Sequence, residues 1–165
     1  MMKTLTIVRH AKSSWKYPEL DDFDRPLNNR GKTDAPLTGR RLKELEISPD
    51  LIITSSANRA LTTAKVIAKM IGYPKKKLVA DKQVYMADSE DVLTVLRQVN
   101  DANKDVFIIG HNPTLTDLAN ELTGEYIGNV PTCGVVRMTL DIDSWRDLKP
   151  GKGSLVLFDY PKKYG

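Results

Sequence analysis

Two apolar runs, each followed closely by a histidine, constrain the fold of this chain more than any other feature. The first run, Thr4 to Val8, is followed by Arg9 and His10, and the second, Asp105 to Ile109, by a glycine and His111. Both runs are rich in β-branched residues and end abruptly in polar ones, a pattern typical of buried strands. Because ligands of an open α/β sheet bind outside the carboxyl ends of its strands, both imidazoles are expected in one crevice. The alternative is a pair of surface histidines that happen to follow strands.

The remainder of the chain alternates strand patterns with helix patterns. Further strands are expected at residues 50–54, 77–80, 133–140 and 154–158. Four helices are expected. The first runs from a cap at Asn28 or Asn29 toward Leu45, and the second follows the capping residues 55–58 and ends at Gly72. The third begins at Glu90 with Ser89 as its cap, and the fourth runs from a cap at Thr114 or Thr116 to Gly124. This order predicts an α/β fold, a three-layer α/β/α sandwich with a mainly parallel central sheet.

The first helix is preceded by an unusually long polar segment, Lys12 to Asn29, which predicts a functional or mobile loop. Pro36 then leaves two possibilities: it kinks one long helix, or the helix starts afresh at an Asp34 cap. A partial helical stripe predicts the buried side of this helix: Leu37, Arg41, Leu42 and Leu45.

Length and composition indicate one domain, residues 1–165, with no need for a second. No stretch approaches the roughly twenty apolar residues of a membrane span, and Met1 to Thr4 lacks the apolar segment of a signal peptide. We therefore expect a cytoplasmic location and no membrane partner. The single cysteine, Cys133, allows no intramolecular disulfide and no thiolate metal cluster. It is interpreted as a small core residue, with a catalytic thiol as the alternative.

The formal net charge of +4 is spread over short runs such as Lys75 to Lys77. No basic run is interleaved with aromatic residues, so a nucleic-acid partner is not expected. A slightly basic surface would instead help to gather an anionic substrate.

The expected sheet edge brings together two arginines and two histidines from three strand-to-helix connections. Arg9 and His10 follow the first strand, Arg59 lies in the first turn of the helix after residues 51–54, and His111 follows the later apolar run. Arginine presents a planar fork of donors that matches phosphate oxygens. No Walker pattern and no GxGxxG loop is present, so side chains would have to hold the phosphate.

Metal binding is the chemical alternative at this edge. The two histidines could combine with Asp81, Asp88 or Asp117, but two arginines beside a dication would be mutually repulsive. We therefore expect no metal and no cofactor. A neutral histidine can instead attack phosphorus and form a covalent phosphoenzyme.

Four ordered blocks of sequence resemble those of the histidine phosphatase superfamily, the phosphoglycerate mutase-like proteins. They are Arg9-His10-Ala11, which is similar to an Arg-His-Gly signature, then Pro26-Leu27 through Gly31, then residues 55–60 through Thr63-Ala64, and finally Gly110 to Pro113. The short chain and the segment Asp24 to Leu27 resemble SixA-type phosphohistidine phosphatases. The resemblance implies a phosphoglycerate mutase-like fold with His10 as nucleophile and Arg9, Arg59 and His111 as the phosphate pocket. It also implies Ser13 and the backbone of Asn112 as further donors.

Two departures from the family pattern affect these expectations. Ala11 replaces a glycine, so the turn after His10 must tolerate a Cβ. Many superfamily members also carry a general-acid glutamate after the third strand, and residues 81–88 contain none. Protonated phosphohistidine releases an imidazole more easily than a phosphate ester releases an alkoxide, so the missing acid favours phosphoramidate substrates. Four aspartates remain possible substitutes: Asp22, Asp24, Asp81 and Asp88.

The leading hypothesis is a metal-independent phosphatase that acts on phosphohistidine in a protein, such as a histidine phosphotransfer domain of a signalling or sugar-transport relay. A second enzymatic hypothesis is a broad phosphomonoesterase acting on small phosphorylated substrates. The third, from another class, is a phosphate-binding or phosphoprotein-binding module without turnover.

Overall fold

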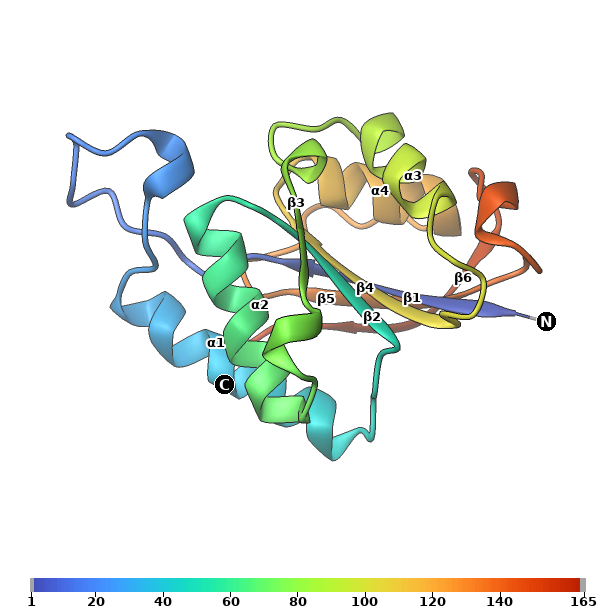
Figure 1. Cartoon of the computed structure of the whole chain (residues 1–165), viewed down its shortest axis with the longest axis horizontal. Coiled ribbons are helices and arrows are strands. Elements are labelled where there is room, and N and C mark those ends of the chain that lie inside the picture. The colour runs from blue at the N-terminus through green and yellow to red at the C-terminus, as the bar shows by residue number, and fades with distance from the viewer. Residues whose placement is uncertain (1, 164–165) are drawn as a thin grey trace.

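The computed structural model describes residues 2–163. Strands and helices alternate along most of the chain, as Figure 1 shows. The strands are β1 (Lys3–Arg9), β2 (Leu51–Ser55), β3 (Val79–Asp81), β4 (Asp105–Gly110), β5 (Val135–Leu140) and β6 (Gly153–Asp159). The helices are α1 (Asn29–Glu44), α2 (Asn58–Ile71), α3 (Ser89–Arg97) and α4 (Thr114–Thr123). Short 3-10 turns include η1 (Asp22–Asp24) and η3 (Lys82–Val84).

The strands form one sheet in the order β3-β2-β4-β1-β5-β6. Strands β3, β2, β4 and β1 are mutually parallel, and β5 and β6 continue the sheet in antiparallel fashion. The predicted mainly parallel sheet is therefore confirmed. Strand β4 lies directly beside β1, with Arg9 opposite Gly110, so the two strands end at the same level.

Both faces of the central strands are buried, and alternate residues of these strands enter separate cores, whereas the edge strands β3 and β6 are partly exposed. In β4, Val106 and Ile108 pack with α3 and α4, whereas Phe107 and Ile109 pack against the side that carries α2. Figure 1 shows α1 and α2 on one face of the sheet and α3 and α4 on the other. The expected three-layer α/β/α sandwich is thus confirmed.

Helix α1 runs unbroken from residue 29 to residue 44 with Pro36 inside it. Its N-cap is Asn28, and Asp34 lies within the helix, where it pairs with Arg30. A fresh helix start at Asp34 is therefore wrong. The predicted stripe is also only partly right, since Leu45 is 53% exposed. Six residues form the buried side instead, most of them small: Gly31, Asp34, Ala35, Thr38, Gly39 and Leu42. At Gly39 the helix lies against Met70 and Ile67 of α2.

The expected side-chain caps of α2 and α3 need correction. Helix α2 begins after Ala57 with no side-chain cap, and the hydroxyl of Ser55 accepts the Ala57 N–H instead. Helix α3 is capped by Asp88 rather than by Ser89, because Asp88 and Asp91 exchange hydrogen bonds in a capping box. The predicted glycine ends of α2 and α4 are confirmed, since Gly72 and Gly124 adopt left-handed backbone conformations.

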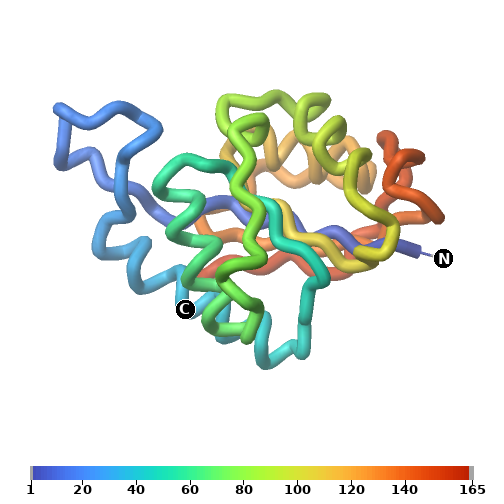
Figure 2. Tube along the Cα trace, viewed as in Figure 1, coloured from blue at the N-terminus to red at the C-terminus, as the bar shows by residue number. Residues whose placement is uncertain are grey.

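The polar segment between β1 and α1 has internal structure. Ser13 and Leu27 form an antiparallel bridge, and the backbone of Ser14 donates to the carbonyl of Pro26. Figure 2 shows this segment, in blue, projecting beyond the sheet beside the start of α1. The 3-10 turn η1 lies at its returning end. None of the helices in residues 2–163 has the length and apolarity that crossing a membrane requires.

Candidate active site

His10 leaves β1 directly beside the end of β4, where its backbone N–H donates to the carbonyl of Gly110. The side chain is buried, with 8% of the residue exposed. Its Nδ1 lies 2.7 Å from the carbonyl oxygen of Ala11. A carbonyl can only accept, so this contact assigns the proton to Nδ1. Nε2 then carries the lone pair, which is the form that attacks an electrophile.

Ala11 stands in the turn that follows His10 without backbone strain. Among the described residues, left-handed backbone outside glycine occurs at Glu46, Met86 and Cys133, and Ala11 does not share it. The Ala11 N–H donates to the hydroxyl of Thr63, which α2 supplies. The turn therefore tolerates a Cβ in place of the glycine of the Arg-His-Gly signature, and α2 holds the backbone beside His10.

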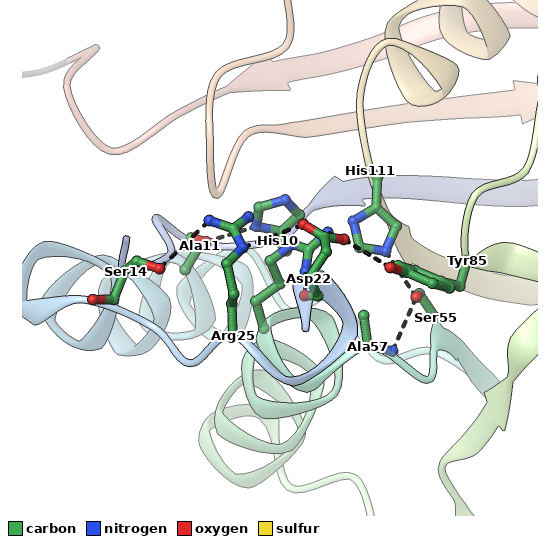
Figure 3. Close-up of polar contacts among 10 residues, drawn as sticks. His10, Ala11, Ser14, Asp22, Arg25, Ser55, Ala57, Tyr85 and His111 are labelled. Carbon is green, nitrogen blue, oxygen red and sulfur yellow. Dashed lines mark hydrogen bonds and ion pairs between the residues drawn. The ribbon is translucent and has the colours of Figure 1, made fainter. Parts of the chain in front are cut away.

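His111 follows β4 and reaches the same crevice. The ring centroids of His10 and His111 lie 5.1 Å apart. Nε2 of His111 lies 2.8 Å from the hydroxyl oxygen of Ser55, which already accepts the N–H of Ala57. When Ser55 donates its own proton to Nε2, the proton of the imidazole is on Nδ1. The end of β2 thus orients the second imidazole, as Figure 3 shows.

Burial keeps both imidazoles uncharged at neutral pH. Burial lowers the pKa of His10 to about 3, and the nearby charges of Arg59 and Arg9 act in the same direction. Burial likewise lowers the pKa of His111 to about 4, again with Arg59 beside it. Removing an ion from water disfavours its charged form, and neighbouring cations add to the effect. His10 is therefore an unprotonated base at physiological pH.

The arginines of this cluster retain donors that the protein does not use. In the part of the chain that the structure describes, three buried side-chain N or O atoms lack a hydrogen-bond partner: Nε of Arg9, Nε of Arg59 and Nδ1 of His111. All belong to residues that sequence analysis placed around His10. Buried polar groups are nearly always paired, so unpaired donors in one cluster indicate a site for an anion with several acceptors.

Asp22 joins the cluster from η1, at the end of the long polar loop. Its carboxylate lies 2.9 Å from a terminal nitrogen of Arg59, and its backbone carbonyl accepts from the other terminal nitrogen at 2.6 Å. The hydroxyl of Tyr85 donates to the same carboxylate at 2.7 Å. Figure 3 shows Asp22 between Arg25 and Tyr85, next to His111. Of the four aspartates considered as acids, Asp22 is therefore the one held at this cluster.

The other aspartates have different roles in the structure. Asp81 accepts the N–H of Gln83 and Asp88 caps α3. Among the described residues, the side chain of Asp24 makes no hydrogen bond and no ion pair. Within residues 2–163, no group of three or more His, Cys, Asp or Glu side chains is arranged to hold a metal ion.

Two further predicted donors have different surroundings. Ser13 is buried in its bridge with Leu27 and lines a groove under the loop, apart from the pocket that contains Arg59 and His111. The Asn112 side chain donates to the carbonyl of Val130 and accepts from Thr116.

The hydrogen bonds of Asn112 bear on two expectations. Helix α4 begins after Pro113 without a side-chain cap from that residue, so neither Thr114 nor Thr116 is its N-cap. The carbonyl of Val130 that Asn112 holds also accepts from Arg9. Asn112 therefore supports Arg9, while phosphate contact by its backbone stays a prediction.

Cys133 lies in the core rather than in the site. It is fully buried, and burial raises the pKa of its thiol to about 12. A thiol of that pKa is protonated at neutral pH and is a poor nucleophile.

Sequence analysis did not single out Ser55, Thr63 or Tyr85 individually. Ser55 and Thr63 lie in the same sequence block as Arg59. Their position in that block is the one sequence feature that could have indicated a role at the site. Tyr85 lies in the segment 81–88, where the expected general acid is a carboxylic acid rather than a phenol. Its ring lies 5.7 Å from that of His111.

Comparison with known sequences agrees with this geometry. The family model of the histidine phosphatase superfamily (branch 1) matches residues 5–82. An uncharacterized protein of Mycobacterium tuberculosis is 31% identical over 166 residues, which cover 94% of this chain and all of that protein. A 2,3-bisphosphoglycerate-dependent phosphoglycerate mutase of Bartonella bacilliformis is 31% identical over 94 residues, 56% of this chain but 46% of the mutase. The chain thus spans about half the length of that mutase.

Solved structures share the whole fold. A protein of Agrobacterium tumefaciens, assigned as phosphohistidine phosphatase SixA, superposes with a TM-score of 0.80 at 25% identity over 96% of this chain and 98% of its own. The protein histidine phosphatase SixA in complex with tungstate gives a TM-score of 0.81 at 22% identity, over 95% and 96% of the two chains. With the family model, the relative of full length and the shared fold in agreement, the chain belongs to the histidine phosphatase superfamily.

Proposed function

We propose that this protein is a phosphohistidine phosphatase that acts on a phosphorylated protein through a covalent phosphohistidine intermediate on His10. The observation that supports it best is the set of unpaired buried donors on Arg9, Arg59 and His111 beside an uncharged His10. A phosphoryl group supplies the acceptors that these donors require, and His10 supplies the lone pair that phosphorus requires.

The reaction proceeds in two displacements at phosphorus. Nε2 of His10 attacks the phosphoryl group, and the leaving nitrogen of the substrate departs with the electron pair of the broken bond. Water then attacks the phosphorylated His10, restores the neutral imidazole and releases inorganic phosphate. The guanidinium groups of Arg9 and Arg59 and the Nδ1–H of His111 stabilise the charge on the equatorial oxygens in both steps.

The cationic groups of the cluster support a reaction without a metal. Arg9 and Arg59 supply the positive charge that a dication supplies in many phosphoryl-transfer enzymes. A dication placed beside two guanidinium groups would be repelled by them.

The leading substrate assignment is supported by the absence of a glutamate in residues 81–88 and by the structural likeness to SixA proteins. The test compares three substrates at equal concentration: a protein phosphorylated on histidine, p-nitrophenyl phosphate and glycerol phosphate. Phosphohistidine and p-nitrophenyl phosphate should react readily, and glycerol phosphate about 100-fold or more slowly, because no acid protonates an alkoxide.

The matched variant in this experiment is His10→Ala. It should lose at least about 10,000-fold in kcat/KM, since nucleophile loss has effects of that order, while its circular dichroism spectrum stays that of the unmodified protein. Rapid acid-free quenching should trap base-stable, acid-labile phosphate on His10 alone. Phosphate trapped on another residue would overturn the assignment of His10 as nucleophile. Equal turnover of glycerol phosphate and phosphohistidine would overturn the substrate assignment and favour the broad phosphomonoesterase.

A further inference from the structure

The carboxylate of Asp22 puts a negative charge at the mouth of the candidate active site. Its side chain is 51% exposed, whereas the side chain of Arg59, which it contacts, is 7% exposed. Asp22 lines an open pocket of about 560 Å³ together with Arg59, Tyr85 and His111. His10 does not line this pocket; it is buried, and its ring lies 5.1 Å from that of His111, which does.

Asp22 accepts hydrogen bonds and is in no position to donate one at neutral pH. Burial raises the pKa of Asp22, but hydrogen bonds from Tyr85 and Arg59 and the charges of Arg59 and Arg25 outweigh it, and the pKa lies below its usual range. The charged and titratable groups around it come from several elements: Arg25 after η1, Arg59 of α2, Tyr85 after η3 and His111 after β4. The carboxylate is therefore ionised, so it is not the general acid that sequence analysis considered.

The leaving group of any substrate faces the Asp22 side of the site. Phosphoryl transfer places the attacking and leaving atoms roughly in line on opposite sides of phosphorus. With His10 at the buried end, the leaving atom points to the exposed end, where the Asp22 carboxylate and the Tyr85 hydroxyl lie. An ionised carboxylate there repels an anionic leaving group and attracts one that carries an N–H or a positive charge.

We propose that Asp22 is the specificity-determining residue of this site and that it accepts the N–H of the protonated, cationic imidazole ring of a phosphohistidine substrate. This inference rests on the proposed function and deepens it. In the step concerned, the bond from His10 Nε2 to phosphorus forms as the bond from phosphorus to the substrate nitrogen breaks. The electron pair of that bond goes to the leaving nitrogen, and the proton on the other ring nitrogen stays where it is. The ring leaves as neutral imidazole, so no proton from the protein is needed.

Asp22 contributes by holding the substrate ring in its protonated, reactive form. A carboxylate within hydrogen-bond distance of an imidazolium favours the charged form and raises the pKa of the ring by about one unit or more. Phosphate esters have no such proton, and for them the carboxylate is only a negative charge near a dianion. Asp22 therefore discriminates between phosphoramidate and phosphate-ester substrates by the charge of the group attached to phosphorus rather than by its shape.

The experiment measures kcat against pH for the unmodified protein and for Asp22→Asn, which keeps an oxygen acceptor for Arg59 and Tyr85 but removes the charge. With a histidine-phosphorylated protein, the basic limb of the kcat profile should move down by about one pH unit, a loss of about 10-fold at pH 8 and little loss at pH 5.5. With p-nitrophenyl phosphate, kcat/KM should rise a few-fold at every pH, because the repulsion is removed. Asp24→Asn, on the same 3-10 turn but without side-chain contacts to the cluster, is the matched control and should change neither substrate.

The other outcomes distinguish failure of this inference from failure of the proposed function. Equal losses with both substrates at all pH values would mean that Asp22 only positions Arg59, and an unchanged phosphohistidine profile would mean that Asp22 does not contact the leaving group; either result overturns the inference while the proposed function stands. No turnover of phosphohistidine by the unmodified protein overturns the proposed function. In that case the small N–P compound phosphoramidate serves as the remaining probe. Its turnover must still show the pH-dependent loss in Asp22→Asn, or the inference falls as well.

Discussion

His10 and His111 face each other across 5.1 Å because β1 and β4 are adjacent parallel strands that end at the same level. His10 is buried and His111 is half-buried, both lie near arginines, and both are uncharged at neutral pH. The Nδ1 of His10 forms a hydrogen bond with the carbonyl of Ala11, and the Nε2 of His111 forms one with the hydroxyl of Ser55. The two histidines therefore present different nitrogens to the space between them.

The lowered histidine pKa values predict activity that persists into mild acid. The pKa of His10 is about 3 and that of His111 about 4, so neither ring gains a proton between pH 7 and pH 5. We expect kcat/KM for p-nitrophenyl phosphate, corrected for ionisation of the substrate, to stay within about 2-fold over this range and to fall below about pH 4. An enzyme-dependent loss centred near the ordinary histidine pKa of about 6.5 would contradict this.

The same pKa values predict that folding stability decreases as the pH falls. In the unfolded chain the histidines titrate near pH 6.5, and in the folded protein near 3 and 4, so the unfolded state binds more protons in between. Stability from these groups is complete above about pH 6.5 and declines toward pH 3. The urea midpoint should therefore be lower at pH 5 than at pH 7. His10→Gln should show a smaller decrease than the unmodified protein, and an equal decrease would assign the effect to other groups.

Chelation should leave the activity unchanged. The positive charge of the site comes from Arg9 and Arg59, and within residues 2–163 no three or more His, Cys, Asp or Glu side chains are grouped so as to hold a metal ion. Turnover of p-nitrophenyl phosphate after dialysis against EDTA should equal that of untreated protein. A loss that added zinc or magnesium restores would contradict the proposed mechanism.

Removal of the Ser55 hydroxyl should weaken catalysis without unfolding the protein. Ser55 orients the His111 ring through Nε2, and a hydrogen bond of this kind contributes about 1 kcal/mol. Ser55→Ala should therefore lower kcat/KM about 5- to 10-fold. It should also lower the urea midpoint modestly, because the Ala57 N–H loses its acceptor. Ser55→Thr, which keeps a hydroxyl, should recover part of the loss. Ser56→Ala in the same turn is the control and should have the activity of the unmodified protein.

Gly31 should be required for close contact between α1 and the segment after His10. A Cβ at this position would lie 2.2 Å from the carbonyl oxygen of Lys12. Gly31→Ala must displace one of these backbones, so we expect destabilisation of about 1–3 kcal/mol together with a lower kcat. Gly128→Ala, whose Cβ would meet nothing within 4 Å, is the control. Equal urea midpoints for the two variants would show that the α1 backbone moves freely.

Much of the site was accessible from the sequence because its main residues are adjacent to strong local patterns. Arg9 and His10 follow one apolar run, His111 follows a second run and a glycine, and Arg59 follows a strand and a turn. Runs of this kind are typical of buried strands. Alternation of strands and helices restricts the connections to parallel ones, which brings these strand ends to one edge. Periodicity and the order of elements thus determined the fold class and the position of the imidazoles and guanidinium groups.

The tertiary structure decided the contacts that depend on packing between distant segments. The pairing of Asp22 with Arg59 and Tyr85, and that of Ser55 with His111, joins elements whose relative position follows from the strand order. The start residues of α2 and α4 do not supply the side-chain caps expected from the sequence, for the same reason. A hydroxyl or amide group forms its hydrogen bond with the partner that tertiary packing places nearest to it. Local sequence determines where a chain turns from strand to helix, whereas the burial and partners of a polar side chain depend on the whole packed structure.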